Sequence, residues 1–348
     1  MALPVDPGET KSAVKTNLRA LLPSIVQKVI AGLIFGFIVF ILLVLFADLR
    51  QVSKSVYRFQ WGLYPGVIAL TLWNYIFRFV KWQYFLKLVS VEGLPVLTSA
   101  RLFVAGFPLA VTPGKVGEAL KGFWLRQLTG IPAARGVSAV LAERISDGLA
   151  MLVLSSLGIL TYPRYWPAFA IVLGLLLGVI IVSQTRPLAV WLLNLGENTP
   201  FVQRFAHPLR EFYEGSFALF RPKSTGLALF LGVISWLAEG VGFYLILIGL
   251  GLTPGWNLMS LAVFILSFST VIGAISTLPG GLLATDASLV GMLVLLLNLN
   301  PQTATAATLL IRFATLWFAV AIGLVAWAFS KDLLGFQASE TNLSKKED

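Results

Sequence analysis

The chain has 348 residues, of which 57% are hydrophobic and only 12% are charged, and its formal net charge is +10. A soluble domain carries about a quarter charged residues, so the composition excludes a soluble enzyme and predicts an integral membrane protein. The basic residues are scattered, which argues against nucleic-acid binding and fits contact with anionic lipid headgroups. With no cysteine and one histidine, His207, the chain excludes disulfides, thiolate chemistry and a histidine-rich metal site, and no metal or other cofactor is expected.

Each membrane crossing needs about 20 apolar residues, and the sequence predicts an all-α bundle of about seven or eight spans. Residues 1–24 are expected to form a cytoplasmic N-terminal arm, residues 25–330 one transmembrane domain, and residues 331–348 a flexible C-terminal tail. Residues 183–226 are polar and are expected to form a loop that carries a surface-lying amphipathic helix. The expected spans are residues 25–46, 62–86, 137–160, 166–183, 227–249, 257–277, 286–299 and 303–329.

Two apolar segments are too short or too broken for an ordinary span. Residues 100–111 stop at Pro113-Gly114, and residues 286–299 follow Pro279-Gly280-Gly281. Irregular backbone is tolerated at membrane depth only where it lines a protein or water cavity. We therefore expect these segments to form re-entrant or broken helices.

The two segments share a pattern of charged residues. Glu118 precedes Arg144 by 26 residues, and Asp286 precedes Arg312 by the same 26 residues. This match predicts inverted repeats over residues 100–160 and 266–329. Transporters with inverted repeats place the substrate site at the interface between the repeats.

A group of charged residues lies inside the expected span 137–160: Glu143, Arg144 and Asp147. A charge at a helix centre costs about 2.5–3.5 kcal/mol on insertion scales, so these side chains need partners or water. Arg144 can reach Asp147 three residues on. One reading is a self-neutralising cluster that locks helix packing, and the other is a polar path or substrate site.

Arg312 lies deep in the last expected span, with no acidic residue within a helical turn. Its partner is expected to be Asp286, Glu118 or an anionic ligand, and these readings stay open. Arg78 and Lys81 lie beside Trp82. They are interpreted as a cationic helix end that snorkels to the interface, with lipid phosphate as an alternative partner for Arg78.

The two Pro-Gly turns carry a third possible source of positive potential. A helix that begins after such a turn presents N–H groups and a partial positive charge suited to phosphate. Gly114, Gly280 and Gly281 would supply these groups, and Lys115 would add a cation. The alternative is that the turns are only helix N-caps.

The basic residues also predict the orientation. The N-terminal arm, the stretch from Arg78 to Arg126 and residues 183–226 hold most of them. Cytoplasmic loops are enriched in lysine and arginine, so these segments and the N-terminus are expected on the cytoplasmic side of the inner membrane. Arg50, Lys54 and Arg58 oppose this assignment.

As a set, these motifs resemble the transmembrane region of the lysylphosphatidylglycerol synthetase family, also described as a flippase-like domain. The likeness lies in residues 113–118, in Glu143-Arg144 with Asp147, and in Pro279-Gly280-Gly281 with Asp286 and Arg312. It covers about residues 25–330 and implies an inner-membrane protein that moves polar lipids between leaflets or supports their synthesis. Leu283 and Asp286 stand where the family more often has glycine and glutamate. The 348 residues contain no soluble aminoacyl-transferase domain, so the synthetase reaction is not expected.

The leading hypothesis is therefore a flippase-like protein that holds a phosphate-bearing lipid headgroup near the midplane. Its partners would be anionic or phosphate-bearing membrane lipids, with a homo-oligomer left open. No catalytic motif is found, so an enzyme is not expected, and without an ATP site movement would be passive or driven by an ion gradient. The alternatives are a membrane-embedded transferase or accessory subunit in glycolipid or polyprenyl-phosphate metabolism, and a non-transporting scaffold. The expected substrate-binding residues are Arg78, Gly114, Lys115, Arg144, Gly280, Gly281 and Arg312, with Glu118, Glu143, Asp147 and Asp286 as charge partners.

Overall fold

The structure is a computed structural model that describes residues 7–46, 48–159, 166–185 and 206–330. Within these residues every regular element is a helix, which confirms the predicted all-α class. The expected N-terminal arm is helical from Pro7, where α1 (Pro7–Phe46) begins. The expected C-terminal tail, residues 331–348, lies outside the described residues.

Six segments of the described chain are long and apolar enough to cross a membrane. They are Pro23–Leu43, Trp61–Leu88, Pro222–Gly249, Trp256–Ile275, Pro279–Leu297 and Pro301–Phe329. They contain part of α1 and the helices α3 (Tyr64–Leu88), α11 (Pro222–Gly249), α12 (Trp256–Ile275), α13 (Ala284–Leu297), α14 (Pro301–Arg312) and α15 (Phe318–Phe329). The bundle also holds α6 (Ala133–Ile159), which carries the predicted charged group, and α7 (Trp166–Gln184).

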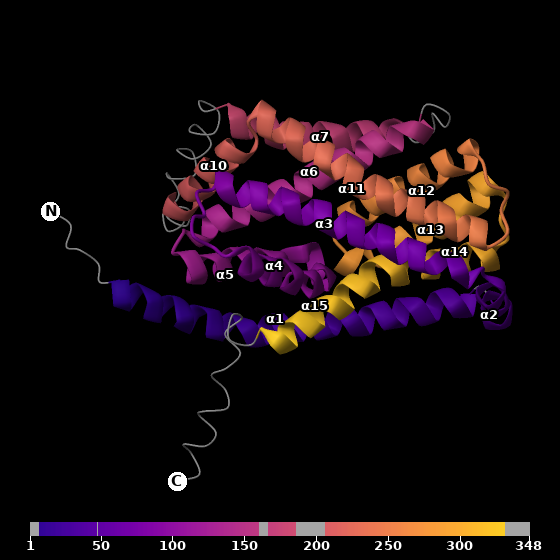
Figure 1. Ribbon diagram of the computed structural model, residues 1–348, viewed down its shortest axis with the longest axis horizontal. Helices are drawn as coiled ribbons and strands as arrows, with labels where there is room; N and C mark the ends of the chain where they lie inside the picture. The colour runs from indigo at the N-terminus through magenta and orange to yellow at the C-terminus, as the bar shows by residue number, and fades with distance from the viewer. Residues whose placement is uncertain (1–6, 47, 160–165, 186–205, 331–348) are drawn as a thin grey trace, which may run out of the picture.

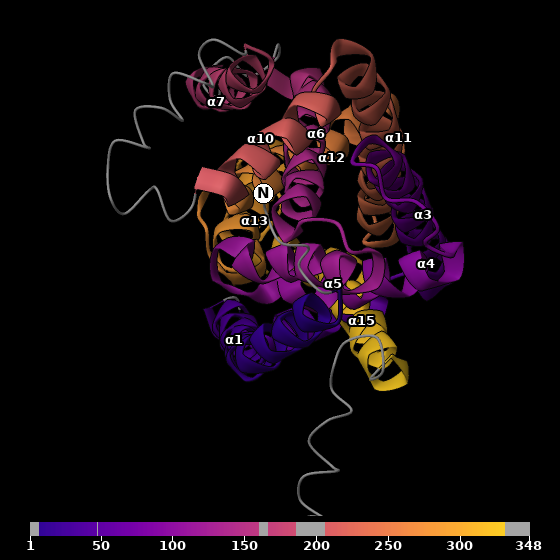
Figure 2. The same cartoon turned by 90° about the vertical axis from the view of Figure 1, so that its left-hand side faces the viewer.

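The long helices share one direction. Figure 1 shows α1, α3, α6, α7 and α11 running along the long axis of the molecule, and Figure 2 shows the bundle from one end. The helices α3, α6, α11 and α12 pack on one another in the centre, while α1 and α7 lie at opposite edges. A short amphipathic helix, α2 (Leu49–Arg58), connects α1 to α3 at one end.

The predicted loop at residues 183–226 is partly helical. The helix α10 (Ala206–Leu219) packs on α6, and α11 begins at Pro222, five residues before the expected span. Proline favours the first turn of a helix because its missing N–H has no partner there. The helix α10 lies within the segment that was expected to carry a helix, whereas residues 222–226 belong to α11 and not to the loop.

The first interrupted segment enters and leaves at the same end of the bundle. It consists of α4 (Val96–Ala105), the 3₁₀ turns Phe107–Val111 and Pro113–Ala119, and α5 (Leu120–Thr129). Ten residues of α-helix rise about 15 Å, about half of a typical hydrocarbon core. Figure 1 shows α4 and α5 side by side at the end where α3 stops and α6 starts, so the pair forms a re-entrant hairpin.

The second interrupted segment approaches from the opposite end. It consists of α12, the 3₁₀ turn Pro279–Gly281 and α13, and Figure 1 shows α13 at the end of the bundle far from α5. The two segments also end alike. Gly130 terminates α5 and Asn298 terminates α13, both in the left-handed conformation, and a proline then precedes or begins the next helix.

The Pro-Gly tips of the two segments meet in the interior. The N–H of Gly114 donates to the carbonyl of Thr277 at 2.8 Å, and Gly114 and Gly280 share the same φ of +61°. Helix α1 covers the tips, because a Cβ at Gly32 would lie 2.0 Å from the carbonyl oxygen of Val111. These parallels support the repeat. A two-fold axis in the membrane plane that superposes residues 100–160 on residues 266–329 stays a prediction.

Candidate functional site

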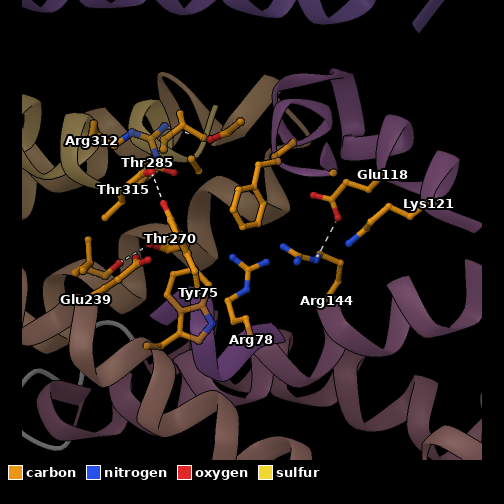
Figure 3. Close-up of a pocket in the computed structure, with 18 residues that line it drawn as sticks. Tyr75, Arg78, Glu118, Lys121, Arg144, Glu239, Thr270, Thr285, Arg312 and Thr315 are labelled. Carbon is orange, nitrogen blue, oxygen red and sulfur yellow. Dashed lines mark hydrogen bonds and ion pairs between the residues drawn. The ribbon is translucent and has the colours of Figure 1, made fainter. Parts of the chain in front are cut away.

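One polar cavity of about 130 Å³ lies beside the Pro-Gly tips, and both Arg144 and Arg312 line it. Figure 3 shows Arg144 and Arg78 on one side and Arg312 on the other. Drug-sized ligands occupy pockets of about 300–1,000 Å³, so this space fits a small polar group and not a whole lipid. The lining comes from both halves of the chain: Tyr75, Arg78, Gly106, Phe107, Ala110, Glu118, Lys121, Arg144, Trp236, Glu239, Leu266, Thr270, Gly280, Thr285, Arg312, Thr315, Leu316 and Ala319.

Arg144 is held by three carboxylates. Its Nε lies 3.2 Å from Glu118 Oε2, its Nη2 lies 2.7 Å from Glu143 Oε1, and Nη2 also lies 3.6 Å from Asp147 Oδ2. The side chain keeps 26% of its surface exposed, whereas Glu118 keeps 6%. The side chain of Arg144 therefore remains partly accessible, whereas the three carboxylates that it contacts are buried.

The charged group on α6 recruits cations from other helices. Arg78 of α3 donates to Glu143 at 2.9 Å, and Lys121 of α5 donates to the other oxygen of Glu143 at 3.0 Å. Lys81, which is fully buried, donates to Asp147. A buried charge is stable only when it is paired. The interpretation of Arg78 and Lys81 as a snorkelling helix end is therefore wrong, since both side chains turn inward to the carboxylates of α6.

Arg312 forms the corresponding pair in the second half. Its Nε lies 2.8 Å from Asp286 Oδ1, and its Nη2 donates to the carbonyl of Gly280 at 3.1 Å. The π-helical turn Phe313–Trp317 follows at once, and such turns occur frequently at functional sites. The hydroxyl of Tyr75 donates to the carbonyl of Thr315 in this turn at 2.8 Å, which fixes the turn against α3.

The two arginine–carboxylate pairs share a detail of geometry. In each pair the Nε and the nearest carboxylate oxygen lie within ion-pair distance, yet none of these four buried atoms has a hydrogen-bond partner among the described residues. The contacts are therefore electrostatic and poorly aligned. An arginine binds a phosphate best through two parallel N–H donors, and neither pair uses the guanidinium in that way.

The Pro-Gly turns support the site through their backbone. Gly280 lies on the cavity wall and offers its carbonyl to Arg312, while Gly281 is buried and donates to the carbonyl of Leu278 at 2.9 Å. Gly114 is exposed and bonds to the second turn. The side chain of Lys115 lies outside what the structure describes.

Hydrogen bonds between a side chain and the backbone are present at both turns. Thr112 Oγ1 accepts from the N–H of Gly117 at 2.9 Å, and Asp286 Oδ2 accepts from the N–H of Leu283 at 2.9 Å. Thr112 therefore contacts a residue beyond the first turn, and Asp286 is the third residue of α13, where it accepts from the N–H of the N-cap residue Leu283. Asp286 serves both as a cap of α13 and as the partner of Arg312.

Three further residues that were not predicted from the sequence line the cavity: Tyr75, Trp236 and Glu239. Glu239 lies in the middle of α11, is 6% exposed and lines the cavity. Arg78 lies over the ring of Trp236, with 5.8 Å between the guanidinium carbon and the ring centroid. A single acidic residue in an apolar span was a visible signal for Glu239, because ionisable residues inside membranes are functional by default.

The lining of this cavity offers the donors that an anion needs rather than the ligands that a metal needs. Among the described residues, no three aspartate, glutamate or histidine side chains gather as a metal site requires. The lining instead presents four cations: Arg78, Lys121, Arg144 and Arg312. Charge-assisted hydrogen bonds from such groups are strong, and the guanidinium of arginine matches the geometry of phosphate through two donors.

The chain matches known proteins over most of its length. The family model described as lysylphosphatidylglycerol synthase TM region matches residues 29–323. A protein named UPF0104 membrane protein, from Methanothermobacter thermautotrophicus, is 22% identical over 309 residues, which are 81% of this chain and 88% of that protein. No solved structure gives a significant match. With its apolar helices and this match, the chain is an integral membrane protein that belongs to the family of the lysylphosphatidylglycerol synthase transmembrane region.

Proposed function

We propose that this protein moves a phosphate-bearing polar lipid between the two leaflets, with the headgroup passing through the cavity beside the Pro-Gly tips. The observation that carries the proposal is the pair of arginines. Arg144 and Arg312 follow a carboxylate by the same 26 residues, pair with that carboxylate, and line one interior cavity.

The main barrier to lipid movement is the loss of headgroup hydration. The transfer of an ionised group from water into an apolar medium costs far more free energy than the transfer of an apolar group of the same size. The cavity replaces water with fixed cations and with the polar groups of Thr270 and Thr285. The acyl tails stay in the bilayer, because a space of about 130 Å³ accommodates only the polar part of a lipid.

The poorly aligned ion pairs support exchange of partners. In the absence of lipid, Glu118 and Asp286 neutralise Arg144 and Arg312. A phosphate that arrives in the cavity can take two donors from each guanidinium, and Asp286 then keeps its other contact. For Asp286 this contact is the N–H of Leu283.

The distribution of basic residues supports a cytoplasmic N-terminus. The N-terminal end of α1, the end of α5 and the start of α11 lie at one end of the bundle in Figure 1. These segments carry Lys11, Lys15, Arg126, Arg221 and Lys223. The positive-inside tendency assigns this end to the cytoplasm, and we place the protein in the cytoplasmic membrane.

The test is leaflet-resolved lipid exchange in proteoliposomes. Vesicles of phosphatidylcholine with a trace of fluorescent phosphatidylglycerol are treated with a quencher that cannot cross the membrane. The wild type is expected to expose inner-leaflet probe faster than protein-free vesicles. Arg144→Gln is expected to lose most of this increase, whereas Arg58→Gln, a change at an exposed arginine on α2, keeps it. Equal rates with and without the wild-type protein would reject the proposal.

A further inference from the structure

Glu239 differs from the other buried carboxylates in and around the cavity. Glu118, Glu143, Asp147 and Asp286 each lie within 4 Å of an arginine or lysine nitrogen. Glu239 is 6% exposed and lines the same cavity, yet among the described residues it has no ion pair and no hydrogen bond. In Figure 3 its side chain lies across the cavity from Arg144.

The groups around Glu239 come from four packed helices. Tyr75 and Arg78 face the cavity from α3, Arg144 faces it from α6, and Arg312 faces it from α14, while α12 contributes the neutral Thr270. The charged side chains that act on Glu239 electrostatically are Arg78, Asp147 and Arg312. No cation is close enough to form a pair, so an ionised Glu239 has only distant compensation. Binding one proton removes the cost of this buried charge.

The charges of the whole network are finely balanced. Among the described residues it contains five cations and five carboxylates, joined by ion pairs or by the shared cavity: Arg78, Lys81, Lys121, Arg144, Arg312, Glu118, Glu143, Asp147, Asp286 and Glu239. With every group ionised the network is neutral. When Glu239 is protonated, the network carries one net positive charge, which matches the single negative charge of a phosphodiester.

We propose that Glu239 is a proton-binding site that takes up one proton when the cavity binds one phosphodiester headgroup. This inference rests on the proposed function and adds the source of energy. Proton and phosphodiester favour each other's binding, because two linked ligands change each other's affinity by the same factor. No covalent step is involved: a proton from water binds a carboxylate oxygen and leaves it again when the phosphate leaves.

The charge balance determines which gradient drives movement. A proton and a phosphodiester anion that travel together carry no net charge. A membrane potential acts only on net charge that moves, so it should have no effect, whereas a pH difference should drive accumulation. One pH unit is a tenfold ratio of proton activity, so coupling of one proton to one lipid predicts roughly tenfold enrichment of the lipid in one leaflet.

The transport test compares two gradients in proteoliposomes that contain fluorescent phosphatidylglycerol. One set receives a pH difference, and the other a potassium diffusion potential with valinomycin. The measured quantity is the enrichment of the fluorescent lipid in one leaflet. The value with the gradient is divided by the value without the gradient. The wild type should respond to the pH difference and not to the potential. Glu239→Gln should bring the ratio to about one whatever its basal rate, and Glu92→Gln, at an exposed glutamate between α3 and α4, should keep the wild-type ratio.

A second measurement tests the proton site without transport. Dimethyl phosphate, a small phosphodiester with one negative charge, is added to the purified protein in weakly buffered detergent, and the pH change is recorded. The wild type and Glu92→Gln should take up protons on binding, whereas Glu239→Gln should not. Thermal unfolding of the variants shows whether the fold is kept.

The outcomes separate the two proposals. If the wild type moves lipid but ignores the pH difference, or if Glu239→Gln keeps the response, the proton site is rejected while the proposed function stands. If the wild type moves no lipid, the proposed function fails and the dimethyl phosphate measurement decides about Glu239. If proton uptake on binding dimethyl phosphate is lost only in Glu239→Gln, the proton site is supported. If the wild type takes up no proton, the proton site is rejected.

Discussion

Arg312 Nε lies 2.8 Å from Asp286 Oδ1, so the arginine of the last long helical run reaches back to the first turn of α13. The first half of the chain contains the equivalent pair, in which Arg144 Nε lies 3.2 Å from Glu118 Oε2. Each arginine is thereby tied to the segment that follows its own Pro-Gly turn. The ion pairs connect the two tips to the helices on which the cavity depends, so their strength should control both the fold and the lipid path.

Asp147 should matter more for stability than Glu118. Asp147→Asn removes the partner of the fully buried Lys81 and weakens contacts to Arg78 and Arg144. Leaving a buried charge unpaired costs about 3–5 kcal/mol. Glu118→Gln leaves Arg144 with Glu143 and Asp147, and we expect a loss of about 1–3 kcal/mol. Thermal unfolding in detergent measures both variants.

The comparison also tests how the buried network is organised. If both variants unfold at the same temperature, the ion pairs of Lys81 and Arg144 contribute equally and the ranking is wrong. Lys81→Met combined with Asp147→Asn should recover much of the stability, because removing both partners of a buried pair is often nearly neutral.

Leu283 is held in a strained conformation. Its φ is 67° and its ψ is −55°, and the N–H of Ala284 donates to the carbonyl of Leu282 at 2.9 Å, which defines a γ-turn of the rare positive-φ form. Sparsely populated backbone angles cost on the order of 1–3 kcal/mol. Leu283→Gly should therefore raise the stability by about 1 kcal/mol, since glycine adopts positive φ without strain.

The control is the same change in a regular helix. Leu295→Gly, at a 69% exposed position of α13, should lower the stability by about 1 kcal/mol. Thermal unfolding of the two variants should thus shift in opposite directions. A loss of stability in both would show that the side chain of Leu283 contributes more than its backbone strain costs.

The orientation can be tested because the chain has no cysteine. Arg126, at the end of α5, and Lys54, on α2, are both exposed and lie at opposite ends of the bundle. Each is replaced by cysteine in a separate variant. In intact cells an impermeant thiol reagent should label the cysteine at position 54 and spare the one at position 126. Inside-out vesicles should give the reverse pattern, and labelling of position 126 in intact cells would reverse the proposed orientation.

The sequence was informative about the spans and about the paired motifs. Long apolar runs predict membrane helices because the bilayer demands about 20 such residues, and α3, α7, α11 and α12 begin and end close to the expected positions. The spacing of Glu118 and Arg144, repeated by Asp286 and Arg312, marked pairs that the structure brings into contact.

Other features of the site could be identified only from the three-dimensional structure. Lys81 and Lys121 occupy different helices from Glu143 and Asp147, and local spacing does not show which helices will be neighbours. The interpretation of Lys81 as a snorkelling residue followed from its nearby tryptophan and failed because α3 packs against α6. The sequence also could not show that Glu239 lacks a partner, since that depends on where five cations from four helices point.

The central claim is that Arg312 binds phosphate. A double mutant distinguishes this role from a purely structural one. Arg312→Gln strands Asp286, and we expect a loss of about 3–5 kcal/mol. Adding Asp286→Asn removes the stranded charge and should restore much of the stability. The decisive measurement is the leaflet-exchange rate of fluorescent phosphatidylglycerol by the double mutant, corrected for folded protein. We predict that the double mutant folds but exchanges lipid no faster than protein-free vesicles, and exchange at the wild-type rate would contradict a phosphate site at Arg312.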